Sequence, residues 1–167
     1  MLAPHFREVL AFEPNKELFQ KWKETPQNVT RYAYALSNRN GTASLYLGSG
    51  EGSLDSLLKE FNYNPGLYHD TAPRRLYVGE RAITVETRTY DSFHFDQTQL
   101  VKIDVEGFER EVLEGMENSL ASKMVDNIMI EVHNRDWEES LTEHLRSYGF
   151  RVKRVDDHPH LFGSLRD

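Results

Sequence analysis

The sequence predicts an α/β fold built on a mostly parallel β-sheet with helices on both of its faces. Short apolar runs alternate with amphipathic helical patterns over most of the chain, which is typical of βαβ units. The last two apolar runs are joined by a short polar turn, which favours an antiparallel hairpin at the end of the sheet. At 167 residues the chain has the length of one domain, and we expect residues 1–167 to form a single domain.

Composition narrows the classes of function. The formal net charge of −7 argues against a nucleic-acid partner, because phosphate binding requires a basic face. No apolar stretch reaches the ~20 residues of a membrane span, and the first residues do not resemble a signal peptide. The absence of cysteine excludes disulfides, thiolate catalysis and cysteine-based zinc sites, and it fits a reducing compartment. We therefore expect a soluble, cytoplasmic protein, and the sequence carries no signal for its oligomeric state.

The first half of the chain is expected to contain four strands, two helices and a long loop. The strands are predicted at 9–12, 29–36, 42–47 and 82–88, and the last two alternate in polarity and are expected to pair antiparallel. A helix after the first strand is expected to bury Leu18, Phe19 and Trp22. Ser53 is expected to cap a short helix that continues through residue 61, and residues 62–75 to form a loop.

The second half repeats the strand–helix pattern. Strands are predicted at 100–104 and 127–132, and the closing hairpin at 150–155 and 161–162. Gly107 is expected to open a helix whose apolar stripe consists of Phe108, Val112, Leu113, Met116 and Leu120. The next helix carries Trp137, Leu141, Leu145 and Tyr148, and Gly149 stands where a C-cap belongs.

Polar residues that end the strands are the candidate site, because open parallel sheets bind ligands at the carboxyl ends of their strands. Glu13 directly follows the first strand, and a carboxylate there can accept hydrogen bonds from both hydroxyls of a ribose. The alternative is that Glu13 only forms part of the turn before Pro14. Asp104 ends an apolar strand, where an acid is costly unless it meets water, a ligand or a cation. The alternative for Asp104 is that it caps the following helix.

Glu131 and His133 lie at the end of a third strand, after the strands that end at Glu13 and Asp104. Residues two apart on a strand point to the same face, and neighbouring strands lie about 4.8 Å apart, so both side chains can reach the substrate that Asp104 reaches. A histidine beside a carboxylate suits a general base. The same trio could hold a divalent metal, or it could be a buried polar cluster that supports the loops.

Five motifs follow one another along the chain. They are AFEPN at 11–15, ALS at 35–37 followed by NGT at 40–42, TYDSF at 89–93, KIDVEG at 102–107, and IEVH at 130–133. In this order they resemble the FkbM family of S-adenosylmethionine-dependent methyltransferases, and the resemblance covers nearly the whole chain. It implies a Rossmann-like class I methyltransferase sheet, mostly parallel with an antiparallel last strand.

The resemblance also implies a cofactor, an acceptor and roles for the site residues. Members of the family typically methylate hydroxyls of sugars, glycolipids or polyketides, so the expected partner is a small hydroxylated molecule. Asp104 is expected to face the methionine portion of S-adenosylmethionine and the acceptor, and His133, oriented by Glu131 or Asp104, to act as the catalytic base. No metal is assigned. The remaining cofactor-binding residues are expected to be Glu13, Pro14 and Asn15 at the ribose, and Ala35, Leu36 and Ser37 beside the adenine.

The sequence departs from the family at its start. The family opens with a strand and a glycine-bearing turn of the type Asp-x-Gly-Ala-Asn-x-Gly, followed by a helix, whereas no glycine precedes Gly41 here. Residues 1–7 resemble only the tail of that helix. We therefore expect the first, central strand to be missing, either because the chain is truncated, which we favour, or because the sheet is genuinely smaller.

Two other functions compete with methyl transfer. One is an inactive methyltransferase-like binding module, and the other is an NAD-dependent oxidoreductase, which ranks last because no hydride-transfer site follows Asp104. The loop at 62–81 is expected to shape the acceptor pocket, and its candidate lining residues are Tyr63, Tyr68, His69, Arg74 and Arg75.

Overall fold

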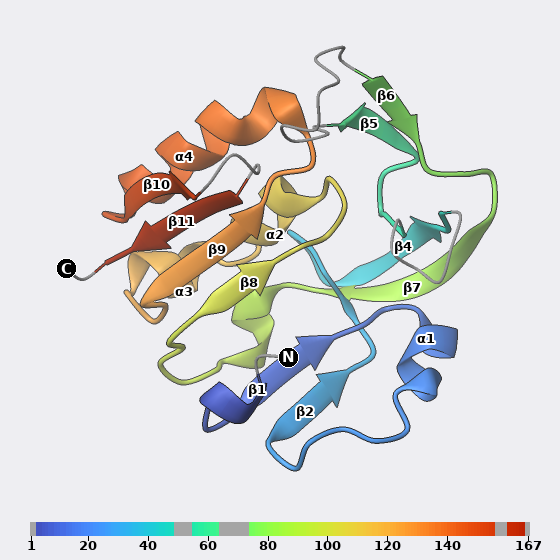
Figure 1. Ribbon diagram of the computed structural model, residues 1–167, viewed down its shortest axis with the longest axis horizontal. Helices are drawn as coiled ribbons and strands as arrows, with labels where there is room; N and C mark the ends of the chain where they lie inside the picture. The colour runs from blue at the N-terminus through green and yellow to red at the C-terminus, as the bar shows by residue number, and fades with distance from the viewer. Residues whose placement is uncertain (1–2, 49–54, 64–73, 156–159, 166–167) are drawn as a thin grey trace.

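Four hydrogen-bonded groups of strands are present in the computed structural model, which describes residues 3–48, 55–63, 74–155 and 160–165 (Figure 1). The largest group has the order β10-β11-β9-β8 and consists of β8 (Val101–Ile103), β9 (Asn127–Glu131), β10 (Arg151–Val155) and β11 (His160–Ser164). β8 and β9 are parallel, whereas β11 runs antiparallel to both β9 and β10. The predicted mixture of parallel strands and a closing antiparallel hairpin is confirmed for this group.

The main hydrophobic core joins this sheet to three helices, α2 (Glu109–Glu114), α3 (Glu117–Ala121) and α4 (Glu138–Ser147). β9 is buried, and Ile128 and Ile130 are 0% exposed. The helices contribute residues of the predicted stripes, namely Val112, Leu113, Met116, Leu120, Leu141 and Leu145. Gly149 follows α4 with φ 85°, which confirms it as the residue that ends this helix. Within the described part of the chain, no helix has both the length and the apolar character needed to cross a membrane.

A second, parallel ladder consists of β1 (Val9–Phe12) and β2 (Val29–Tyr32), with α1 (Lys16–Lys21) between them in the sequence. Phe12 stacks on Tyr32 with ring centroids 5.0 Å apart. Phe93, which ends η2 (Tyr90–Phe93), meets both rings edge-on at 5.4 and 5.2 Å. These aromatic contacts attach the β1-β2 ladder to the segment that precedes β8.

The remaining strands form two smaller groups. β3 (Ala35–Leu36), β7 (Ala82–Arg88) and β4 (Gly41–Tyr46) are arranged in the order β3-β7-β4, and β5 (Glu60–Tyr63) pairs antiparallel with β6 (Arg74–Tyr77). The predicted antiparallel pairing of the segments 42–47 and 82–88 is confirmed by the register of Ala43 opposite Val85. Two short 3-10 helices are η1 (Ala3–His5) and η3 (Arg135–Trp137).

The helix predicted from the cap at Ser53 through residue 61 is wrong in its described part. Ser56 forms an antiparallel bridge with Tyr46, and the chain then enters β5. The apolar spacing in this segment also suits a strand, and pairing with β4 and β6 outweighs the helical preference. The loop predicted at 62–75 is wrong at both ends for the same reason, while Ser53 lies outside the described residues.

Three further expectations need correction. The segment 29–36 is not one strand, because β2 and β3 belong to different ladders. The helix predicted from Gly107 is divided into α2 and α3 at Gly115, where an added Cβ would lie 2.1 Å from the carbonyl oxygen of Ser37. Trp22 is not buried by α1: it follows the helix and is 40% exposed.

β1 and β8 are the facing ends of the β1-β2 ladder and of the four-stranded sheet. In Figure 1 the strands succeed one another across the molecule in the order β2, β1, β8, β9, β11 and β10. Among the described residues, no ladder pairing joins β1 to β8. Each of these strands therefore ends its ladder.

Candidate functional site

The carboxyl ends of β8 and β9 bring together the three residues predicted to form the catalytic cluster. The parallel register places Ile103 opposite Ile130, so Asp104 and Glu131 follow directly on neighbouring strands. His133 Nε2 lies 3.8 Å from Asp104 Oδ1 and 3.6 Å from Glu131 Oε1. The three side chains therefore lie close together, while their catalytic role stays a prediction.

His133 is held through its other ring nitrogen by Glu109. The Nδ1 atom lies 2.8 Å from Glu109 Oε1, and the same oxygen accepts the backbone N–H of Gly107 at 2.9 Å. Glu109 is 0% exposed, because the turn at Gly107 brings the first residue of α2 against the end of β9. The expected orienting partner was Glu131 or Asp104, but Glu109 is the residue that hydrogen-bonds the ring.

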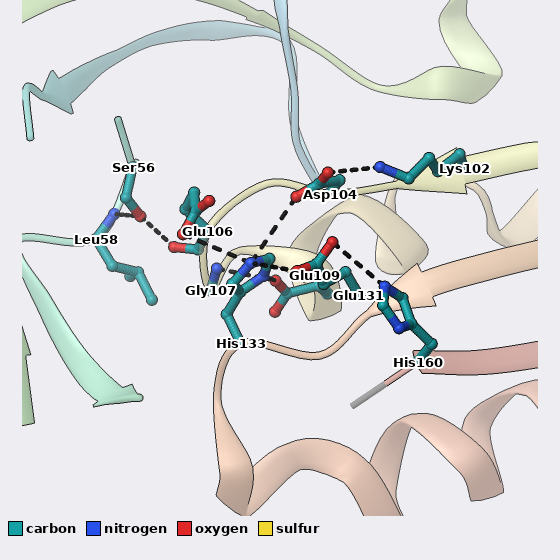
Figure 2. A network of polar contacts seen from close by, with 10 residues as sticks. All are labelled: Ser56, Leu58, Lys102, Asp104, Glu106, Gly107, Glu109, Glu131, His133 and His160. Atoms are coloured by element: carbon teal, nitrogen blue, oxygen red, sulfur yellow. Dashed lines mark hydrogen bonds and ion pairs between the residues drawn. The ribbon is translucent and has the colours of Figure 1, made fainter. Parts of the chain in front are cut away.

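Glu106 brings a further carboxylate to the cluster, from the loop between β8 and α2. Its Oε2 atom lies 3.5 Å from His133 Nε2 and, although buried, has no hydrogen-bond partner among the described residues. The backbone of Glu106 has φ 52°, in the left-handed region that residues other than glycine adopt infrequently. Its carbonyl oxygen accepts a hydrogen bond of 2.6 Å from Ser56 Oγ. Figure 2 shows the acidic side chains gathered around the ring of His133.

Burial and charge crowding shift the protonation of two groups in this cluster. Burial raises the pKa of Glu106 to about 7; the charge of His133 opposes the rise, and the charges of Asp104, Glu131 and Glu109 add to it. Burial lowers the pKa of His133, but the hydrogen bond with Glu109 and the charges of Glu106, Glu109 and Glu131 outweigh burial and leave this pKa raised. The cluster thus concentrates negative charge around one imidazole.

The outer oxygens of two carboxylates are already paired. Asp104 Oδ2 accepts a hydrogen bond of 2.5 Å from Lys102 Nζ, and Glu131 Oε2 lies 3.4 Å from His160 Nε2. The second oxygen of each carboxylate is the one that faces His133. These outer pairs orient both side chains toward the ring.

The turn after β1 holds Glu13 beside a helix cap. Glu13 Oε1 accepts the backbone N–H of Asn15 at 2.8 Å, and Asn15 Oδ1 caps α1 through the N–H groups of Glu17 and Leu18. Burial raises the pKa of Glu13 despite the hydrogen bond from Asn15, and the charge of Asp55 adds to the rise. Glu13 therefore takes part in the turn, and its half-buried carboxylate stands at the end of β1, while its role at the ribose stays a prediction.

Two consecutive residues connect the turn after β1 to the loop after β8. Asn15 Nδ2 donates to Asp55 Oδ2 at 3.0 Å, and the next residue, Ser56, donates to the carbonyl of Glu106. Because adjacent residues lie only about 3.8 Å apart along the chain, the Glu13 turn and the acidic cluster are neighbours. The structure thus brings two of the predicted site segments together.

The third predicted site segment lies in β3 and the turn that follows it. Ala35 and Leu36 form β3, and the N–H of Ser37 donates to the carbonyl of Arg88 at 2.9 Å. The carbonyl of Ser37 approaches the break between α2 and α3. Of the residues expected to line the acceptor pocket, Tyr68 and His69 lie outside the described residues, whereas Tyr63, Arg74 and Arg75 lie in β5 and β6.

Sequence reasoning missed two residues of the cluster, Glu106 and Glu109. Glu106 stood in the motif KIDVEG, two residues after Asp104, which was a usable signal. Glu109 gave no such signal, because an acid in the first turn of a helix is favoured by the helix dipole wherever it points. Only the fold shows that it is buried against His133.

Fold and site together define a class: an α/β protein whose polar cluster lies at the carboxyl ends of neighbouring parallel strands. Comparison with known families identifies the family of this chain. The chain belongs to the FkbM methyltransferase family, because residues 6–152 match the family model described as the Methyltransferase FkbM domain. The assignment inferred from the five motifs is therefore confirmed.

Two relatives extend the comparison. The chain is 29% identical over 133 residues to the hexuronic acid methyltransferase AglP of Haloferax volcanii, an overlap that covers 75% of this chain and 47% of that protein. It also resembles the crystal structure of the methyltransferase FkbM from Methylobacillus flagellatus KT, with a TM-score of 0.56 and 13% identity, covering 95% of this chain and 36% of the other. The chain thus spans about half the length of AglP and 36% of the chain in the crystal structure. The likeness to that crystal structure supports the fold alone.

Proposed function

We propose that the protein transfers the methyl group of S-adenosylmethionine to a hydroxyl oxygen of a sugar or similar small molecule. The observation that carries this proposal is the cluster of Asp104, Glu131 and His133 at adjacent strand ends in a chain of the FkbM family. An aliphatic hydroxyl is a poor nucleophile until it loses its proton, and this cluster gathers groups able to accept one.

The turn after β1 suits the ribose of the cofactor. One oxygen of Glu13 accepts the N–H of Asn15, and its raised pKa shows that burial outweighs this one donor. The two hydroxyls of a ribose supply further donors to such a carboxylate. The cofactor supplies a methyl group already activated by its sulfonium, so the protein has to bind, orient and deprotonate the acceptor. We assign Pro14 and Asn15 to the same ribose-binding turn, and Ala35, Leu36 and Ser37 to the adenine side.

The class of acceptor rests on the curated relative, which is named as a hexuronic acid methyltransferase. Sugars offer several hydroxyls that a group of carboxylates can bind by hydrogen bonds. We therefore favour a sugar hydroxyl over that of a polyketide as the acceptor.

The proposed function also requires a complete cofactor cradle. β1 and β8 each end their ladder within the described residues, and both run in parallel ladders. We propose that one further strand pairs between them and gives the Rossmann-like class I sheet that the family resemblance implies. Such a strand satisfies the backbone groups along both edges. A glycine turn after it allows the backbone to approach the cofactor closely.

A methyl-transfer assay tests the function. The full chain is incubated with methyl-labelled S-adenosylmethionine and, in parallel, with a hexuronic acid, a neutral hexose and a fully methylated hexose that offers no free hydroxyl. We expect labelled methyl ether from the hydroxylated sugars, and a loss of at least about 100-fold in rate in His133→Ala. If calorimetry detects no cofactor binding by a folded protein that includes the further strand, the protein is a binding module and the proposal is wrong.

A further inference from the structure

We infer that Asp104, Glu106 and His133 form a binding site for one divalent metal ion. The proposed function does not require such an ion. The inference depends on that function only for what the ion does to the acceptor, because metal binding can be measured with neither cofactor nor acceptor present.

The distances between the three residues are those of ligands that share an ion. His133 Nε2 lies 3.5 Å from Glu106 Oε2 and 3.8 Å from Asp104 Oδ1, and one ligand atom from each residue lies within 4.8 Å of the others. Good N–H···O hydrogen bonds are much shorter, at about 2.7–3.2 Å. Two ligands that each lie about 2.1–2.4 Å from a common ion are separated by about 3–4.8 Å, depending on the angle between them.

A buried carboxylate oxygen faces this position without a hydrogen bond. Glu106 Oε2 is buried and has no hydrogen-bond partner within the described residues, and the nitrogen that it faces, His133 Nε2, lies 3.5 Å away, longer than a good N–H···O hydrogen bond. The side chain of His133 is itself only 7% exposed. Leaving a buried polar group unsatisfied is costly, so this oxygen indicates a ligand that the described part of the chain does not supply. Figure 2 shows both side chains directed toward the same space as Asp104.

Glu109 prepares His133 to bind a metal. An ionised carboxylate can only accept, so the contact of Glu109 with Nδ1 favours a proton on Nδ1, and a metal ion that displaces the proton of Nε2 can then bind at that nitrogen. Histidines that bind metals almost always donate their other N–H to a carboxylate, a backbone carbonyl or water. The buried Glu109–His133 pair is therefore the expected outer support of a metal-bound histidine.

The charge of the cluster favours a cation over a neutral ligand. Asp104, Glu106, Glu109 and Glu131 surround one imidazole, and the cations Lys102 and His160 lie against the outer oxygens of Asp104 and Glu131. One nitrogen and two carboxylate oxygens form a mixed donor set, which Mn²⁺ tolerates and which leaves coordination positions for water or an acceptor oxygen.

The ion gives the cluster a defined role in the proposed reaction. An acceptor hydroxyl bound to the cation loses its proton more readily and is held for in-line attack. Its proton passes to the Glu131 carboxylate as the new O–C bond forms and the S–C bond breaks, and the sulfonium sulfur leaves as a neutral thioether. His133 is then a ligand, and not the base expected from the sequence.

Manganese binding tests the site directly. The full chain is titrated with Mn²⁺ in the absence of cofactor and acceptor, and free Mn²⁺ is followed by its electron paramagnetic resonance signal. We expect one ion per chain, and binding at least tenfold weaker in Asp104→Asn and Glu106→Gln. Glu109→Gln, which alters only the outer support, is expected to weaken binding by roughly 10- to 100-fold. Glu86→Gln, at an exposed carboxylate of β7, is the matched control and should bind like the parent chain.

The outcomes separate the metal site from the function. If the folded parent chain binds no Mn²⁺, or if the Asp104 and Glu106 variants bind as tightly as the control, the inference is overturned and His133 retains its predicted role as base. Methyl transfer that persists in chelator would overturn the catalytic role of the ion but not the proposed function. Stoichiometric Mn²⁺ binding without methyl transfer would count against the function alone. Circular dichroism of each variant shows that it is folded.

Discussion

At the scale of single residues, Glu13, which we propose to bind the cofactor, carries a carboxylate whose burial costs stability at neutral pH. Burial raises its pKa above the ordinary value of 4.5, so the folded state retains a proton that the unfolded state has lost. Stability conferred by that proton declines as pH rises from about 4.5 through the folded pKa, and it is absent above it. The effect is opposite to that of a salt-bridged carboxylate.

Replacing this carboxylate by an amide should therefore have two opposite effects. In Glu13→Gln we expect a free energy of unfolding equal to that of the parent near pH 4 and higher than that of the parent at pH 7–8, measured by urea denaturation. Cofactor affinity should fall by roughly 10- to 100-fold, because a charged hydrogen-bond acceptor for the ribose is lost. Glu24→Gln, at an exposed residue after α1, is the control and should change neither quantity. A pH-independent effect on stability would contradict this account of Glu13.

The sequence predicted part of the acidic cluster for a specific reason. Asp104, Glu131 and His133 follow apolar strands, and strand ends can be recognised from one-dimensional patterns. Glu106 reaches the cluster through a left-handed backbone turn and Glu109 through the packing of α2, and neither depends on a pattern in the sequence. Side-chain direction in loops is decided by tertiary contacts such as the hydrogen bond from Ser56 to Glu106.

At the scale of elements, a segment with a strong local pattern was predicted correctly, and segments shaped by distant contacts were not. β1 was predicted with its observed bounds, because a strongly apolar run ends at Pro14. The single helix predicted from Gly107 failed at Gly115, because nothing in the local sequence announces that the turn after β3 will approach its backbone. The segment 55–63 failed for a similar reason, since its pairing partners are distant in the chain.

The break between α2 and α3 can be tested with one added methyl group. In Gly115→Ala the new Cβ would lie 2.1 Å from the carbonyl oxygen of Ser37, which is backbone and cannot rotate away. We expect a loss of about 1–3 kcal/mol in the free energy of unfolding, as for other overpacked positions. Ser122→Ala, at an exposed residue after α3, should stay within about 0.5 kcal/mol of the parent. Equal denaturation midpoints for both variants would show that the turn after β3 can move away from the added methyl group without loss of stability.

At the scale of the whole molecule, the β1-β2 ladder and the sheet that contains β9 differ in how their strands are supported. β9 pairs with a neighbour on each side, whereas β1 pairs only with β2 among the described strands. The main core lies at the β9 ladder, and the β1 ladder is attached through the half-buried aromatic contacts around Phe93. Stability should therefore be distributed unevenly along the chain.

Hydrogen exchange measures this distribution. In the chain of 167 residues, amides of β9 and β11 should exchange at the rate of global unfolding, and amides of β1 should exchange at least tenfold faster. Mass spectrometry of peptides that cover 9–12 and 127–131 provides the comparison. Equal protection of both peptides would show that β1 is supported on both edges in solution.

The left-handed backbone of Glu106 has a consequence for directed evolution. The other residues with positive φ that are not glycine, among those described, are His94 and Lys123, and both follow helix ends, whereas Glu106 lies in the loop before α2. For such a residue the conformation costs roughly 1–2 kcal/mol relative to glycine. A library selected only for resistance to proteolysis should therefore enrich Glu106→Gly, and the purified variant should be more stable yet bind Mn²⁺ poorly. Retention of glutamate under that selection would show that the backbone there is unstrained. Selection for stability alone would thus replace Glu106, and such a replacement would indicate that the glutamate serves binding and not stability.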